Sequence, residues 1–118
     1  MVNFLHLSDF HIPNQRGDKR DNIDPFQKLD NLLEYAKKLE LNPAFTIITG
    51  DLSDTGTQQS YKHVKEYIIE IQDLGGPVIP TTGTRDRRTN FSKILLGKSS
   101  QLKEPPCYYS KTIEDIHI

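Results

Sequence analysis

An aspartate and a histidine stand two residues apart near the N-terminus, directly after a short apolar run. Asp9 and His11 follow the segment 2–7, which reads VNFLHL. A carboxylate and an imidazole form a ligand pair that suits divalent transition metals. In an open α/β sheet, ligands bind outside the carboxyl ends of the strands, so a strand over 2–7 would deliver this pair to a binding edge. Asp-x-His is common in loops, and its meaning depends on the residues at the ends of the later strands.

Two later apolar runs also end in polar motifs: GDLSD at 50–54 after the run 45–49, and GTRD at 83–86 after the run 77–82. The carboxyl ends of parallel strands lie at one edge of a sheet, so we expect Asp9, His11 and Asp51 to converge. A single Asp after a strand is usually a turn or cap residue. Converging carboxylates, however, repel one another unless a cation or proton lies between them. The occurrence of both Asp9-x-His11 and Gly50-Asp51-x-x-Asp54 at successive strand ends favours a metal site.

Hydrophobic periodicity predicts the helices that separate these strands. Asp24 is a good N-cap and Pro25 a good first helical residue. Apolar residues then recur at three- and four-residue spacing until Asn42-Pro43 ends the helix: Phe26, Leu29, Leu32, Leu33, Ala36 and Leu39. A second helix is expected from about Thr57 to Gly75-Gly76, with its buried side drawn from Tyr61, Val64, Ile68, Ile71 and Leu74.

The whole pattern is β-α-β-α-β, which predicts an α/β fold with parallel strands and right-handed crossovers. The first strand is apolar on both sides, so we expect both of its faces to be covered. Residues 8–23 form a polar loop of a length that is often functional. A short helix is expected over 87–96, and pieces of further strands at Tyr108-Tyr109 and 116–118.

Composition limits the class of protein. The chain has 118 residues, which fits one domain, and its net charge of −1 gives no strong signal for nucleic acid or anionic membrane. The single cysteine, Cys107, excludes an internal disulfide and fits a reducing compartment. We expect no secretion signal, because the N-terminus lacks a basic stretch followed by a long apolar one, and no apolar run approaches the roughly 18 residues that span a bilayer. We therefore expect a cytoplasmic protein without a membrane partner.

The longer strings resemble the calcineurin-like metallophosphoesterases, especially the branch with the class III cyclic-nucleotide phosphodiesterases: HLSDFH at 6–11, GDLSDTG at 50–56 and GTRDRRTNF at 83–91. The resemblance implies a four-layer α/β/β/α sandwich, of which residues 1–118 are the N-terminal part of a C-terminally truncated domain. It also implies that Asp9 and His11 bind one metal ion and that Asp51 bridges two, with Mn, Fe or Zn as the expected metals. The implied reaction is hydrolysis of a phosphodiester or phosphomonoester by a metal-activated water.

One loop departs from the family pattern, which has Gly-Asn-His-Asp where this chain has Gly83-Thr84-Arg85-Asp86. The Thr84 hydroxyl is a poorer ligand for the second metal than the amide of the family's Asn. Arg85 cannot exchange a proton near neutral pH, because its pKa exceeds about 12. The family's later histidine ligands also have no counterpart. We therefore expect at most one bound ion, held by Asp9, His11 and Asp51.

Other residues of the motifs are given secondary roles. Arg85 is either a phosphate clamp, since guanidinium matches phosphate oxygens, or a solvated loop residue. Asp54, Asp86 and Arg88 are expected to support the site. A small basic patch is expected beside it, made of Arg85, Arg87, Arg88 and Lys93.

Two function classes stay open at this point. One is a metal-dependent phosphoesterase, impaired by the 83–86 loop and by truncation, that acts on a phosphate-ester small molecule or nucleotide. The other is a non-catalytic binding or scaffold protein with a degenerate phosphoesterase fold.

Two further histidines and one face of the sheet also carry expectations. We expect His6 to pack within its strand and His63 to be exposed on its helix. Apolar residues such as Phe4 and Ile47 would be left exposed without a second sheet, which favours a homo-oligomer or a partner that supplies the missing half.

Overall fold

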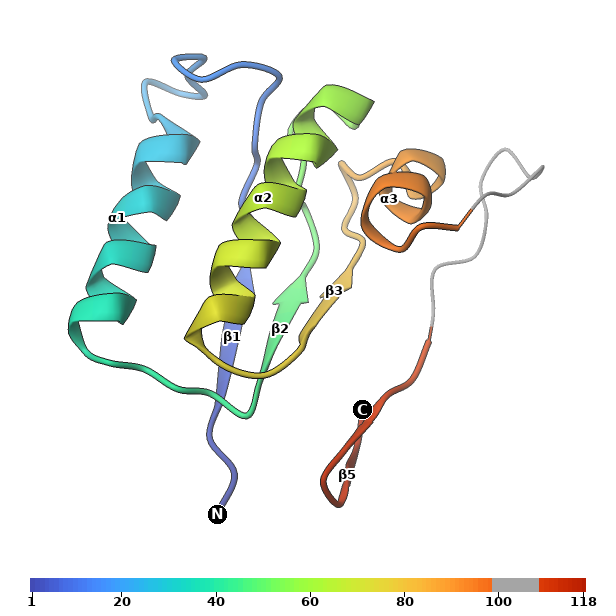
Figure 1. The fold of residues 1–118 in the computed structure, drawn as a ribbon. Coiled ribbons are helices and arrows are strands. Elements are labelled where there is room, and N and C mark those ends of the chain that lie inside the picture. The colour runs from blue at the N-terminus through green and yellow to red at the C-terminus, as the bar shows by residue number, and fades with distance from the viewer. Residues whose placement is uncertain (99–108) are drawn as a thin grey trace.

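The computed structural model describes residues 1–98 and 109–118, in which strands and helices alternate (Figure 1). In chain order the elements are β1 (Phe4–Ser8), α1 (Pro25–Lys38), β2 (Phe45–Thr49), α2 (Gln58–Leu74), β3 (Val78–Thr81), α3 (Arg88–Leu95), β4 (Thr112–Ile113) and β5 (Ile116–His117). The first three strands form a parallel sheet in the order β1-β2-β3. This confirms the predicted β-α-β-α-β core and the helix expected over 87–96.

The C-terminal segment differs in part from its prediction. Strands β4 and β5 form a small antiparallel hairpin, which confirms a strand near 116–118. Tyr109 belongs to no strand, and its hydroxyl donates a hydrogen bond to the carbonyl of Pro80 in β3. The predictions for Tyr108 and Cys107 lie outside the described residues.

A local cap fixes where α1 begins. The Asp24 carboxylate accepts a hydrogen bond from the Gln27 amide at 3.2 Å, and Pro25 occupies the first turn. The helix ends at Lys38, a few residues before Asn42-Pro43. Of the expected apolar stripe, Leu32 and Leu39 are 41% and 52% exposed, so the buried side of α1 is narrower than predicted.

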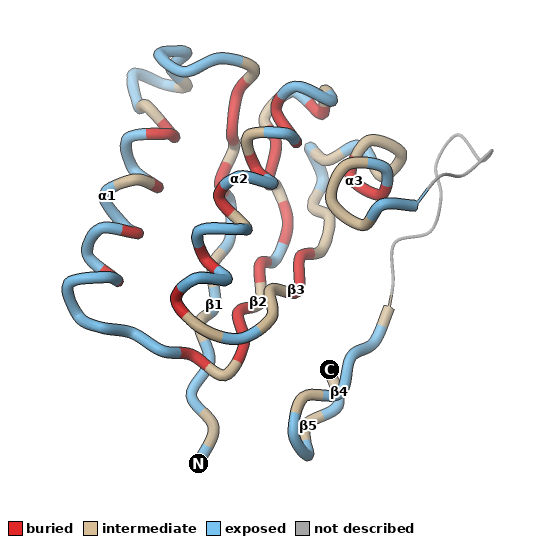
Figure 2. The backbone as a smooth tube through the Cα atoms, in the orientation of Figure 1, coloured by how far each residue is buried: buried red, intermediate tan, exposed pale blue. Residues whose placement is uncertain are grey.

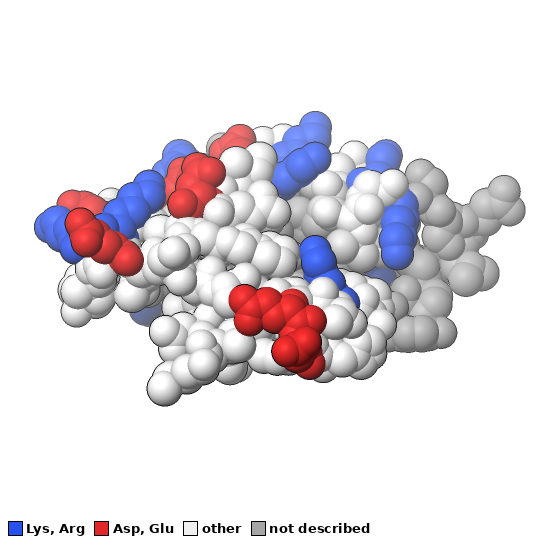
Figure 3. Space-filling view, turned by 60° about the horizontal axis from the view of Figure 1, so that its bottom comes forward, with Lys and Arg blue, Asp and Glu red and all other residues white. Residues whose placement is uncertain are grey.

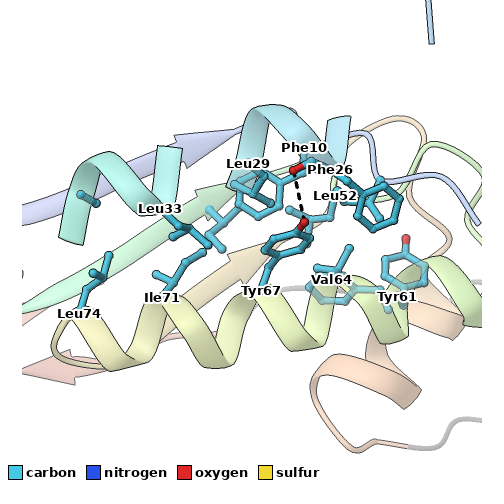
Figure 4. Close-up of a cluster of buried hydrophobic side chains, with 14 residues drawn as sticks. Phe10, Phe26, Leu29, Leu33, Leu52, Tyr61, Val64, Tyr67, Ile71 and Leu74 are labelled. Atoms are coloured by element: carbon cyan, nitrogen blue, oxygen red, sulfur yellow. Dashed lines mark hydrogen bonds between the residues drawn. The ribbon is translucent and has the colours of Figure 1, made fainter. Parts of the chain in front are cut away.

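The core lies between the helices and one face of the sheet, as the red segments of Figure 2 show. In Figure 4 the side chains of Phe26, Leu29 and Leu33 from α1 meet those of Tyr67 and Ile71 from α2. Tyr67 was not among the residues expected to be buried. It packs with its ring in the core, and its hydroxyl donates to the Asp30 carboxylate at 2.7 Å.

The expectation that both faces of β1 are covered is wrong. Leu5 and Leu7 pack against the core, whereas Phe4 is 55% exposed and His6 is exposed on the opposite face. Figure 1 shows α1 and α2 on the same side of the sheet, and β1 lies at its edge. We call the side that carries Phe4, His6 and Ile47 the outer face. Its predicted exposure is confirmed at Phe4, while Ile47 is half-buried.

Both histidine expectations are also wrong. His6 lies exposed on the outer face, where its Nε2 is hydrogen-bonded to Thr49 Oγ1 at 2.8 Å. The His63 side chain is only 19% exposed. It meets the Phe26 ring edge-on, and its Nε2 donates to the Asn14 carbonyl at 3.1 Å. The loop after β1 thus folds back over α2 and covers His63.

Charged side chains of both signs are interspersed on the face shown in Figure 3. This distribution agrees with the net charge of −1. Among the described residues, none of the helices has both the length and the apolar character needed to cross a bilayer.

Candidate metal centre

The pairing of β1 with β2 continues beyond the two strands into the loops that carry the motifs. The amides of Asp9 and His11 donate to the carbonyls of Gly50 and Asp51 at 3.1 and 2.9 Å. The Ile12 amide then donates to the Leu52 carbonyl at 2.9 Å. The two loops therefore leave the sheet side by side, which places the Asp-x-His pair next to the Gly-Asp motif.

Asp9, His11 and Asp51 converge, as their positions at the ends of parallel strands predicted. Each offers one ligand atom, and these atoms all lie within 4.8 Å of one another. His11 Nε2 is 3.6 Å from Asp9 Oδ1. Two ligands about 2.1 Å from one tetrahedral ion would lie roughly 3.4 Å apart. The group therefore has the composition and approximate spacing of a divalent metal site.

The backbone at all three residues is left-handed, with φ values of +57° at Asp9, +48° at His11 and +50° at Asp51. Such a conformation is uncommon for residues other than glycine. Backbone strain of this kind gathers at ligand-binding sites, where the surrounding structure enforces it. The sequence carried no sign of it.

The second ring nitrogen of His11 gives an independent test of the fit. Nδ1 is buried and has no hydrogen-bond partner among the described residues, and Asp54 Oδ1 lies 3.8 Å away. Buried polar atoms are rarely left without a partner. A metal-binding histidine commonly directs its other nitrogen toward a carboxylate. The ring is therefore oriented as a metal ligand would be, with Nε2 toward Asp9.

The 83–86 loop contacts Asp51 directly. The Arg85 amide donates to Asp51 Oδ1 at 2.9 Å, and the Thr84 hydroxyl reaches the same oxygen at 3.4 Å. This approach requires glycine at position 83, because a Cβ there would overlap the amide nitrogen and the carboxylate of Asp51. Thr84 thus contributes a hydrogen bond to a candidate ligand.

Asp86 joins the two loops to each other and to α2. Its two carboxylate oxygens accept four hydrogen bonds, from the amides of Leu52, Ser53 and Gly83 at 3.1, 3.0 and 2.8 Å and from the Tyr61 hydroxyl at 2.7 Å. Burial, followed by the hydrogen bond to Asp86, raises the pKa of Tyr61 above its usual range. Sequence reasoning treated Tyr61 as core alone, because nothing in its spacing indicates where the hydroxyl points.

The Asp54 carboxylate, which lies next to His11, forms ion pairs with two arginines. Its Oδ1 lies 3.2 Å from Arg85 Nη1 and 3.4 Å from Arg20 Nε. The sequence did not single out Arg20, although this residue lies in the long polar loop over 8–23.

Arg88 begins α3 and is half-buried.

A cavity of about 340 Å³ opens beside Asp9 and His11, between the end of β1 and the start of α1. Its lining includes Asp9, His11, Arg20, Ile23 and Lys28. The cavity walls are mainly apolar, and their charged groups are Asp9, Arg20, Asp21 and Lys28.

The fold and the site together define an α/β protein with a candidate metal centre at the carboxyl ends of parallel strands. Comparison with known families then makes the class specific. Residues 2–114 match the profile of the calcineurin-like phosphoesterases, and the chain belongs to that family.

Curated relatives carry phosphodiesterase names. The chain is 31% identical over 97 residues to a probable cyclic nucleotide phosphodiesterase of Rhodococcus erythropolis, which covers 81% of this chain and 32% of the relative. It is 30% identical over 101 residues to a cAMP/cGMP dual specificity phosphodiesterase of Mycobacterium tuberculosis, covering 83% and 31%. A probable glycerophosphodiester phosphodiesterase of Arcobacter nitrofigilis is 30% identical over 89 residues, covering 75% and 32%. The chain thus spans about a third of the length of these relatives.

Proposed function

We propose that this chain is the N-terminal part of a metal-dependent phosphoesterase that hydrolyses a phosphodiester. The observation that carries the proposal is the convergence of Asp9, His11 and Asp51 at the ends of β1 and β2. Phosphodiester substrates, including cyclic nucleotides, are favoured over phosphomonoesters because the three relatives named above are all called phosphodiesterases.

The three residues would hold one divalent ion, with Mn, Fe or Zn as the candidate metals. Three protein ligands leave coordination positions open, as in mononuclear catalytic sites. Such an ion, when bound, activates water and polarises a phosphate ester. A second ion is disfavoured because Thr84 is a weak ligand and the positive charge of Arg85 opposes it.

The chain's own residues would orient the reactants. The Arg85 amide fixes the Asp51 carboxylate through its 2.9 Å hydrogen bond. The Arg85 guanidinium, now 3.2 Å from Asp54, would clamp the phosphate of a bound ester. Arg85 stays charged throughout, so its role is to hold the phosphate and not to transfer a proton.

A second candidate function is a binding or scaffold protein without catalysis. The observation in its favour concerns positions 84 and 85, at which the family has Asn and His. In this chain Thr84 and Arg85 stand there, and both contact acidic residues of the 50–54 loop. Such a protein would keep the fold, and one metal ion, without turnover.

The first experiment separates these functions. Mn²⁺ binding to the 118-residue chain is measured by calorimetry, and hydrolysis of an aryl phosphodiester is followed with Mn²⁺ present. We expect one ion per chain, and a loss of affinity of roughly 100-fold or more in Asp51→Ala, because a ligand is removed. Asp73→Ala, an exposed carboxylate of α2, is the matched control.

Turnover and metal binding together discriminate between the two functions. Turnover by the unmodified chain that Asp51→Ala abolishes would exclude the scaffold function. The scaffold function would be supported if the unmodified chain binds Mn²⁺ without turnover and a Thr84→Asn, Arg85→His double variant gains activity. Two ions per chain would contradict the single-metal proposal.

The remaining assignments stay predictions. They are a cytoplasmic location, supporting roles for Asp54, Asp86 and Arg88, and either a homo-oligomer or a partner over the outer face. Size-exclusion chromatography across a range of concentrations would test self-association directly.

A further inference from the structure

Arg20 is held at the base of a tight turn. The amides of Arg20 and Ile23 each donate to the other's carbonyl at 2.8 Å. Between them, Asp21 and Asn22 have φ values of +49° and +62°. Two central residues with positive φ define the type I′ turn of a two-residue hairpin. The backbone of Arg20 is therefore fixed within a loop that otherwise has little regular structure.

The side chain of Arg20 shares an acceptor with Arg85. Both guanidinium groups approach Asp54 Oδ1, at 3.4 Å from Arg20 Nε and 3.2 Å from Arg85 Nη1. Among these three groups, the two guanidinium charges exceed the single carboxylate charge by one. Each guanidinium has five N–H donors, and in the described part of the chain one nitrogen of each contacts Asp54. Donors therefore remain for a further anion.

Arg20 also lines the cavity that lies beside Asp9 and His11. It lines the cavity of about 340 Å³ together with Asp9 and His11. Lys28 adds a second positive charge to the lining, and Asp9 and Asp21 add two negative ones. The Arg20 side chain is 32% exposed, so a ligand in the cavity can reach it.

We propose that Arg20 is a second anion-binding residue of this centre, which acts with Arg85 on the non-bridging oxygens of a phosphate group. Asp54 is the internal counter-ion that holds both guanidinium groups in position until the anion arrives. The inference rests on the proposed function, because it assumes that the phosphate is brought to Asp9, His11 and Asp51. It adds a recognition residue that lies outside the motifs.

A purely structural role for Arg20 makes a different prediction. If the Arg20–Asp54 contact only tied the loop down, its loss would lower thermal stability, or would weaken metal binding through Asp54 and His11. An anion-binding role instead changes affinity for phosphate while metal affinity stays constant. The two readouts are therefore measured on the same variants.

The test uses calorimetric titration of inorganic phosphate into the Mn²⁺-saturated chain, preceded by titration of Mn²⁺. In Arg20→Ala we expect phosphate affinity to fall roughly tenfold, the effect of losing a charge-assisted hydrogen bond. Arg20→Lys should recover part of the loss, because the charge remains without the planar fork. Lys65→Ala, which removes an exposed charge on α2, is the matched control and should bind phosphate as the unmodified chain does.

Each result decides between the proposals. Unchanged Mn²⁺ affinity with weakened phosphate binding in Arg20→Ala supports the inference. Unchanged phosphate affinity, a parallel loss of Mn²⁺ affinity, or an equal effect of Lys65→Ala overturns it and leaves the proposed function standing. Failure of the unmodified chain to bind Mn²⁺ overturns both.

Discussion

At the scale of single residues, the carboxylate of Asp51 has two oxygens with different surroundings. Within the described residues, the donors from Thr84 and Arg85 both reach Oδ1. Oδ2 is therefore the oxygen better placed to bind an ion. Hydrogen bonds to one oxygen of a ligating carboxylate fix its orientation, which is how outer residues tune a metal site.

The buried phenol of Tyr61 predicts a pH dependence of stability. Its pKa is raised by burial and by the Asp86 carboxylate, whereas an unfolded tyrosine has a pKa near 10. Above about pH 10 the unfolded chain therefore loses protons that the folded chain keeps, and stability falls as pH rises. Urea unfolding at pH 10 and 11 should show a decline about 1 kcal/mol steeper in the unmodified chain than in Tyr61→Phe.

Tyr35→Phe is the control for this measurement, since Tyr35 is 61% exposed. Tyr67 has the same sign of shift, because burial and Asp30 raise its pKa, so Tyr61→Phe should keep part of the decline. Equal slopes for Tyr61→Phe and the unmodified chain would contradict the assignment.

Residue types and their places at strand ends predicted the convergence of Asp9, His11 and Asp51, but they did not predict what surrounds these residues. Asp9, His11 and Asp51 could be selected because each follows an apolar run and because carboxylate and imidazole suit the same ions. Arg20 and Tyr61 could not, because Arg20 lies within a long loop and Tyr61 within a helix, and not at a strand end where the sheet topology predicts neighbours. Long side chains reach in directions that spacing does not encode.

At the scale of elements, the 50–54 and 83–86 loops touch through two glycines. Gly50 has a φ of +74°, and a Cβ on it would lie 2.8 Å from the Cα of Gly83. At Gly83 the obstacle to a side chain is steric, because the added Cβ would overlap Asp51. The contact between these loops therefore depends on the absence of both side chains.

Gly83→Ala should separate the two loops. We expect a loss of about 1–3 kcal/mol in the free energy of unfolding, the usual effect of overpacking, together with weakened Mn²⁺ binding. Gly17→Ala is the comparison, because Gly17 has a φ of +94° but nothing within 4 Å of the added Cβ. Denaturant unfolding of both variants measures the difference. If Gly83→Ala binds Mn²⁺ with the same affinity as the unmodified chain, this description of the two loops is contradicted.

The starts of the helices were more predictable than the burial of the strand faces. Asp24 and Pro25 are local signals that start α1 whatever surrounds it, and Thr57 caps α2 in the same way by accepting from the Ser60 amide at 3.3 Å. Burial of β1 depends on which elements cover it, so the apolar residues Phe4 and Leu5 looked alike in sequence and differ in the fold.

At the scale of the whole molecule, metal binding should be coupled to stability. An ion that binds only the folded chain adds about 2.7 kcal/mol when its concentration is 100 times the dissociation constant. For a chain of this size the melting temperature should rise by roughly 10 °C. Circular dichroism during heating, with and without Mn²⁺, measures the shift.

The same ion should leave the melting temperature of Asp51→Ala almost unchanged at that concentration, and a chelator should reverse the shift in the unmodified chain. An equal rise in both chains would show that Mn²⁺ binds elsewhere.

The hydrogen bonds of Asp86 have a consequence for how the two loops move. The amides of Leu52, Ser53 and Gly83 depend on one carboxylate, so releasing one of them disturbs the acceptor of the others. The loop after β2 and the loop after β3 are thereby coupled, and their fluctuations should be concerted. Ions and esters would then meet either a fully assembled centre or an open one, with few intermediate arrangements between them.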